Sequence, residues 1–250
     1  MINDKVFLGL PIKFKDICSI YPPTVKEVIS NDKFDIYQSL FIMTQEELDE
    51  AYLKDENVTQ VPTPFQYLLM NYYQNDEVKE LIEEAFDFFV REPVTIVPEI
   101  EMLLIGKSED ELDPDVDLEN PRLLTEDNFF EFQNQVRLVM GLETILPPDP
   151  EEEELDPRIK RWKMKVKESE KIIKKKKDKE APTLGTLLAA ICCMGIGLNP
   201  LNIGEMSYAC IQWLIAMYQQ NESYDIDIKA LLAGADSKKV KPKYWIKNLD

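Results

Sequence analysis

A long stretch with almost no charge is the feature that most constrains how this chain can fold. Between Ala181 and Asn221 the only charged residue is Glu205. The chain as a whole is 30% charged, so a stretch of this length would ordinarily carry about 12 charged residues. Apolar side chains at this density need cover. We therefore expect a helical unit that is buried against the chain itself, against another protein, or both.

The stretch divides into two predicted helices. Thr183 is a helix N-cap, Gly195 and Gly197 end the first helix, and Asn199-Pro200 turns the chain. A second helix is expected over 203–220, and a third short helix around Ile228, Leu231 and Leu232. The second helix carries two apolar stripes. One stripe holds Met206, Cys210, Trp213, Leu214 and Met217, and the other holds Tyr208, Ile211, Ile215 and Tyr218.

One of these stripes has to be internal to the helical unit. The stripe of Tyr208, Ile211, Ile215 and Tyr218 then packs on the third helix or is covered by a partner protein. Beyond the third helix, Tyr244, Trp245 and Ile246 stand among basic residues, where packing on this unit and contact with a partner are both open. The candidate partner-binding residues are Met206, Tyr208, Ile211, Trp213, Ile215, Met217, Tyr218, Tyr244 and Trp245.

The preceding part of the chain predicts a mainly α fold with a small β component (α+β). A β-hairpin is expected between Val6 and Tyr21, around Gly9 to Pro11. Helix starts are predicted at capping boxes: Thr24 with Glu27, Thr44 with Glu47, and Thr63 with Gln66, while Thr125 caps a further helix. The segment 76–91 has an amphipathic helical period, and the β-branched segment 94–106 predicts short strands. The acidic segment 108–121 reads as an exposed loop.

Charge changes sign along the chain and predicts its domains. Residues 1–156 hold 37 acidic and 11 basic side chains, whereas residues 157–180 hold 4 acidic and 12 basic ones. The prolines and glutamates after residue 146 cannot form a packed core. We therefore predict an acidic, mostly helical domain at 1–146, a partly helical acidic and basic linker at 147–182, and a small apolar helical domain with a basic, aromatic tail at 183–250.

Several classes of function are disfavoured by composition. The net charge of -18 repels nucleic acids and anionic membranes. The chain has no histidine, the commonest acid-base catalyst, and contains no nucleotide-binding or hydrolase motif. We expect no enzyme activity, no cofactor and no metal site, and we read all four cysteines as small buried apolar residues. No apolar run is long enough to span a bilayer, which predicts a cytoplasmic protein.

Six segments resemble the tail-assembly chaperones of tailed phages and prophages of Firmicutes. They are YPPTVKEV at 21–28, TPFQYLLMN at 63–71, EPVTIVPE at 92–99, DPRIKR at 156–161, LAAICCMGIGLNPLNIGEMSY at 188–208 and ALLAGADSKKVKPKYWIKNL at 230–249. The resemblance implies a non-catalytic protein of the bacterial host cytoplasm that coats the tape-measure protein. It also implies recruitment of tail-tube subunits through the carboxy-terminal part, and a second, frameshifted product at the lysine run 174–177 becomes a hypothesis.

Two other functions are open at this point. A structural tail or connector component of a phage particle would self-assemble and be present in purified particles. A histidine-free regulatory or enzymatic protein would instead be stabilised by a small ligand. Partner identity, stoichiometry and self-association are not determined by the sequence.

Overall fold

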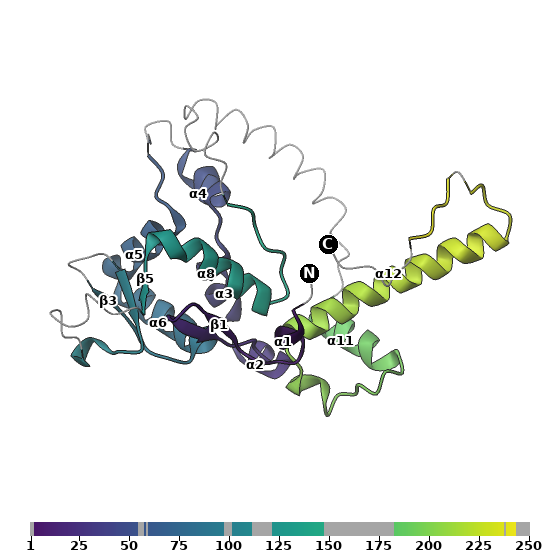
Figure 1. Cartoon of the computed structure of the whole chain (residues 1–250), viewed down its shortest axis with the longest axis horizontal. Helices are drawn as coiled ribbons and strands as arrows, with labels where there is room; N and C mark the ends of the chain where they lie inside the picture. The colour runs from purple at the N-terminus through teal and green to yellow at the C-terminus, as the bar shows by residue number, and fades with distance from the viewer. Residues whose placement is uncertain are drawn as a thin grey trace.

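The structure, a computed structural model, describes residues 3–54, 58, 60–97, 102–111, 122–147, 183–237 and 239–243. The predicted fold class is confirmed, since helices dominate and the sheets are small and antiparallel (Figure 1). The elements are α1 (Asp4–Phe7), β1 (Ile12–Phe14), β2 (Cys18–Ile20), α2 (Val25–Ser30), α3 (Phe34–Ile42), α4 (Gln45–Tyr52), α5 (Pro64–Gln74), α6 (Asp76–Val90), β3 (Val94–Val97), β4 (Met102–Ile105), η1 (Glu109–Glu111), β5 (Leu123–Leu124), α8 (Glu126–Val139), α11 (Leu184–Cys193), η3 (Ile203–Glu205) and α12 (Tyr208–Leu232).

The predicted capping boxes start three of these helices. In α2, the Thr24 hydroxyl accepts the Glu27 N–H at 3.1 Å, and the Glu27 carboxylate accepts the Thr24 N–H at 2.7 Å. The same reciprocal pair begins α4 at Thr44 and α5 at Thr63. Each box satisfies N–H groups that have no partner within the helix. Local sequence therefore determines where these helices begin.

The amino-terminal hairpin forms, but its turn is not where the sequence predicted it. Strands β1 and β2 pair antiparallel with Ile12 opposite Ile20, and the turn lies between Phe14 and Cys18. The backbone reverses at Lys15, which has a φ of 50°. The predicted turn around Gly9 instead ends α1, which takes up Val6. The alternation of apolar and polar residues predicted the strand pair. Val6, where the hairpin was expected to begin, belongs to the short helix α1 instead.

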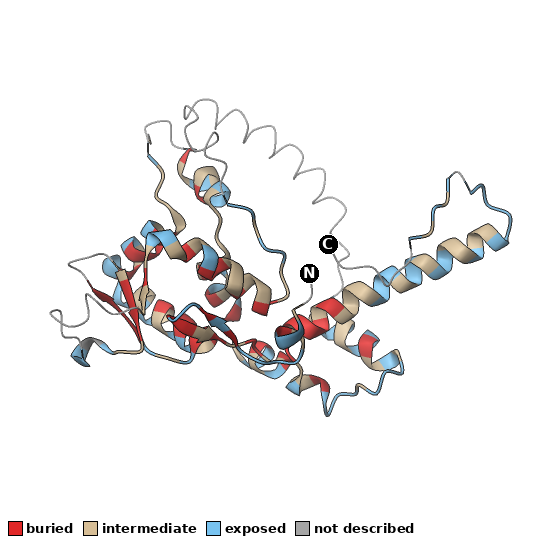
Figure 2. Ribbon diagram, in the orientation of Figure 1, coloured by how far each residue is buried: buried red, intermediate tan, exposed pale blue. Residues whose placement is uncertain are grey.

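Aromatic rings form the centre of the main hydrophobic core. Phe41 of α3 is fully buried, with its ring centroid 4.9 Å from Phe86, 5.7 Å from Phe89 and 5.6 Å from Phe132. These rings come from α3, α6 and α8, and most of the pairs meet edge to face, which their quadrupoles favour. The sheet β3-β4-β5 contacts α6 through β3. Every residue of β3 is buried (Figure 2).

The start of α12 packs on this core rather than standing apart from it. Ala209 and Trp213 belong to the same hydrophobic cluster as the aromatic centre. The Trp213 ring stacks on Phe7 at 6.4 Å, and the Tyr208 ring meets Phe34 at 5.8 Å. The division at 1–146 and 183–250 stays a prediction, while the predicted linker 147–182 lies outside the described residues apart from its first position. Contacts between the two predicted domains are nevertheless extensive.

The carboxy-terminal part differs from the prediction of three separate helices. α12 is a single helix from Tyr208 to Leu232, so the expected second and third helices are continuous. Between them the segment 221–227 contains neither Gly nor Pro, so nothing in the backbone interrupts the helix. The first part of α12 lies against the body of the molecule and the second part extends away from it (Figure 1).

Candidate protein-binding surface

The uncharged segment builds its own small hydrophobic cluster. Ile191 of α11, Ile203 of η3 and Ile211 of α12 are buried together with Val25 of α2. Leu188, Leu214 and Ile215 pack around them. Thr183 caps α11 as predicted, because its side chain accepts the Thr186 N–H. The charge-free composition is therefore explained in part by a core that α11, η3 and α12 make with α2.

Backbone hydrogen bonds hold the entry to α12 against the amino-terminal region. The buried Ser207 hydroxyl donates to the Val6 carbonyl at 2.9 Å and accepts the Cys210 N–H at 3.1 Å. The Val25 N–H donates to the Met206 carbonyl, and the Tyr208 N–H donates to the Pro23 carbonyl. Ser207 thus caps α12 and ties it to α1 at the same time. These contacts fix the position of α12 on the body.

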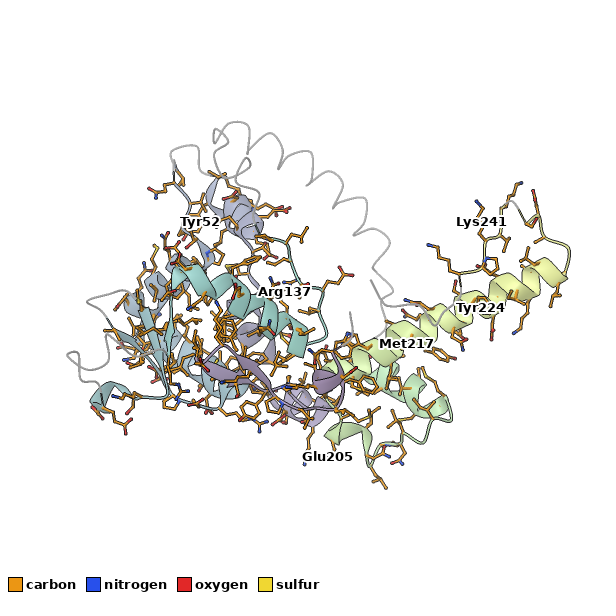
Figure 3. All side chains as sticks on the ribbon, in the orientation of Figure 1. Tyr52, Arg137, Glu205, Met217, Tyr224 and Lys241 are labelled. Carbon is orange, nitrogen blue, oxygen red and sulfur yellow. The ribbon has the colours of Figure 1, made fainter. Side chains whose placement is uncertain are left out.

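The predicted partner-binding residues that the structure describes have different environments. Some pack on the main core, some pack on the small cluster, and two lie farther along α12. Ile211 faces the small cluster, whereas Trp213 faces the main core with only 9% of its surface exposed. Met206, Tyr208 and Ile215 are half-buried against the two clusters. Met217 is half-buried and Tyr218 is 37% exposed, while Tyr244 and Trp245 lie outside the described residues. Met217 lies where α12 leaves the body (Figure 3).

Two environments were predicted as alternatives for the stripe of Tyr208, Ile211, Ile215 and Tyr218, and the structure tests only the one within the chain. The expected packing on the segment around Ile228 is wrong, because a continuous α12 places Ile228 about 25 Å along the axis from Ile211. The stripe instead splits between neighbours. Tyr208 meets Phe34 of α3, and Ile211 packs with Ile191 of α11. Only Tyr218 reaches the surface.

Sequence reasoning missed two exposed apolar side chains in the loop between α11 and η3. Leu201 is 93% exposed and Ile196 is 52% exposed, whereas Met194 and Leu198 of the same loop pack on the small cluster. Turn residues such as Gly195 marked this segment as a loop. Large apolar residues are unusual at exposed turns, and that signal was available in the sequence. The loop presents an uncharged, apolar surface.

Burial raises the pKa of two groups in this region, and a neighbouring carboxylate raises the pKa of a third. Desolvation raises the pKa of the Cys210 thiol to about 11 and raises the pKa of the Tyr208 hydroxyl. The neighbouring Glu222 carboxylate raises the pKa of Tyr218, whose hydroxyl lies 3.2 Å from it. Glu205 forms an exposed ion pair with Lys26 at 3.9 Å, which is too solvated to contribute much stability.

The cysteines do not share one environment. Cys18 and Cys210 are buried as predicted, Cys192 is half-buried, and Cys193 is exposed. The prediction that all four are buried is therefore wrong for Cys193, because α11 packs on α12 through one face only. Within the described residues, no group of three or more Cys, Asp or Glu side chains is placed to hold a metal ion. The described helices also include none with the length and apolar character needed to cross a membrane.

Thiol labelling is expected to separate these cysteines. At pH 8 a maleimide should modify Cys193 at least about 100-fold faster than Cys18 or Cys210, because the buried thiols are inaccessible and their pKa values are raised to about 12 and about 11. Peptide mass spectrometry after timed labelling measures the rates. Cys193→Ser should remove the fast site, and equally fast labelling of Cys210 would show that α12 does not pack as described.

The fold and this surface define a class: a mainly α protein that presents an uncharged helical unit, with an exposed apolar loop, on an acidic body. Residues 174–250 match the family model described as the YomV second domain, which is a phage-associated family. The match relates this chain to phage and prophage proteins through the part that contains α11, the apolar loop and α12. No match was found among curated proteins or among solved structures.

Proposed function

We propose that this protein is a non-catalytic phage tail-assembly chaperone that binds the tape-measure protein and helps to recruit tail-tube subunits. One observation carries the proposal: the match to a phage-associated domain falls on the same residues that present the uncharged, apolar loop. The segment resemblances to tail-assembly chaperones point to the same role. Its setting is the cytoplasm of the bacterial host.

The physical character of the surface suits a chaperone for long helical partners. Leu201 and Ile196 are large, exposed and distant in sequence from any charge other than Glu205, so a partner's apolar side chains can cover them without desolvating ions. The body carries a strong excess of acidic groups, which keeps a complex with an aggregation-prone partner dissolved. Apolar contact and charged exterior therefore lie in different parts of the chain.

Substitution at the loop tests this function. Leu201→Ser is expected to weaken binding of the tape-measure protein about tenfold or more, because covering a leucine contributes about 1.5–3 kcal/mol. Co-purification with the tape-measure protein and titration of the purified pair measure the effect. Leu146→Ser is the matched control, since Leu146 is 89% exposed but lies on the chain after α8. Equal binding by both variants would contradict a role for the loop.

Deletion of residues 183–250 is a poorer test than a point substitution. It removes Ala209 and Trp213 from the main core and breaks the contacts of Val6 and Phe34. Loss of binding after that deletion would follow from damage to the body as well as from loss of the surface. Mass spectrometry of purified particles completes the test, because a structural tail component would be present in them and a chaperone would be absent.

A further inference from the structure

The segment after α12 carries positive charge that has no carboxylate partner among the described residues. Lys239, Lys241 and Lys243 are exposed, and none of them forms an ion pair with a described residue. Five lysines of the body are instead paired with carboxylates, at distances of 2.6 to 4.0 Å: Lys13, Lys15, Lys26, Lys33 and Lys79. We call residues 239–243 the basic segment. It presents free cations on a chain whose net charge is -18.

The fold holds the basic segment along the outer part of α12, away from the body. Gly234, with a φ of 95°, follows the helix and turns the chain. A second turn is closed where the Val240 N–H donates to the Asp236 carbonyl at 3.0 Å. The chain then returns along α12, where Lys241 is labelled (Figures 1 and 3). Val240 and Pro242 are half-buried between the exposed lysines, so the segment directs its charges to solvent.

The outer face of α6 carries the opposite charge. Asp76, Glu80 and Asp87 are exposed, and they form no ion pair with a described residue. Spacings of four and seven residues place these carboxylates on one face of the helix, over about 16 Å of its length. α6 belongs to the body, whereas the basic segment lies at the other end of the molecule (Figure 1). The two surfaces are therefore too far apart to meet within one chain.

We propose that the basic segment of one copy docks on the acidic outer face of α6 in a second copy. Opposite charges that lack partners in each copy are paired in this contact, which is the complementarity that selects one partner over others. Because the two surfaces differ, each copy can present its basic segment to one neighbour and its α6 to another. The contact does not depend on tape-measure binding.

The projection of α12 reduces the repulsion between two acidic bodies. Met217, where α12 leaves the body, and Tyr224 are about 10 Å apart along the helix axis, and Lys241 is drawn above Tyr224 in Figure 3. Exposed charges farther apart than about 8 Å are largely screened at physiological ionic strength. A nucleic acid or an anionic bilayer is a poorer partner, because its extended phosphate surface would also approach the acidic body.

Cross-linking of the full chain tests this contact. A carbodiimide joins lysine amines directly to carboxylates that touch them. A mixture of isotope-labelled and unlabelled protein is expected to give cross-links of mixed isotope between residues 239–243 and 76–87. Raising the NaCl concentration from about 50 mM to about 500 mM should lower their yield about tenfold, because salt screens contacts between exposed charges. Mass spectrometry of the cross-linked peptides measures the yield.

Charge reversal identifies the residues in contact. Lys241→Glu and Glu80→Lys should each lower the yield of mixed-isotope cross-links at least about threefold, because each places like charges together. Both substitutions in one chain should restore the yield, since Glu at 241 then meets Lys at 80 of the next copy. Lys54→Glu is the matched control, because it makes the same charge change at an exposed lysine of the body. Near-ultraviolet circular dichroism checks that each variant is folded.

Several results would overturn the proposal. Cross-links between 239–243 and 76–87 that are absent, or found only within one chain, would exclude the contact. A yield that falls equally with Lys54→Glu and Lys241→Glu, or that the double substitution does not restore, would show that these residues do not pair. Co-sedimentation with anionic vesicles, or binding to a short DNA duplex, in the absence of mixed-isotope cross-links would make a phosphate surface the partner.

Discussion

Phe41→Ala is expected to lower the free energy of unfolding by about 4 kcal/mol, the range found when a buried phenylalanine is truncated. Phe41 has no exposed surface and contacts the rings of Phe86, Phe89 and Phe132, which belong to two other helices. Truncation leaves a cavity that those rings cannot fill, since each is held by its own neighbours. Urea denaturation followed by circular dichroism measures the change.

Ile36→Ala on the same helix is the control for this substitution. Ile36 is 45% exposed, so its truncation removes little buried area and should change the free energy of unfolding by less than about 1 kcal/mol. A similar small effect for Phe41→Ala would mean that the rings of α3, α6 and α8 do not form the centre of the core.

Gly141→Ala is expected to lower the free energy of unfolding by about 3 kcal/mol, the sum of a conformational cost and a steric one. Gly141 has a φ of 74°, which costs an L-residue about 1–2 kcal/mol. An added Cβ would also lie 2.9 Å from the Cα of Ala209, closer than such atoms approach. Overpacking of this kind costs about 1–3 kcal/mol. The substitution therefore acts where the segment after α8 meets α12.

Gly195→Ala separates backbone strain from the contact. Gly195 has a φ of 73°, nearly the same as Gly141, but a Cβ added there would meet nothing within 4 Å. Its substitution should cost only the conformational term, about 1–2 kcal/mol. The difference between the two variants reports the packing of Gly141 on Ala209. Equal costs would show that α12 is not held at this point.

Local signals in the sequence predicted much of the amino-terminal region. The capping boxes at Thr24, Thr44 and Thr63 depend on residues three apart, and each forms as expected. The amphipathic period of α6 likewise predicted which side is buried, with Ile82 and Phe86 fully covered. These features rest on interactions within one or two helical turns, so the sequence alone contains what is needed to predict them.

The environment of the uncharged segment was harder to predict. Periodicity showed that α12 has apolar stripes, but it could not show which neighbour covers each stripe. Tertiary structure assigned Trp213 to the main core, Ile211 to the cluster with α11, and Leu201 to the surface. It also joined two predicted helices into one. The sequence by itself determined helix starts, buried faces and the uncharged composition, because these depend on near neighbours along the chain. Which surfaces remain exposed was decided only by the tertiary structure, because it depends on contacts such as that of Ser207 with Val6, 201 positions apart.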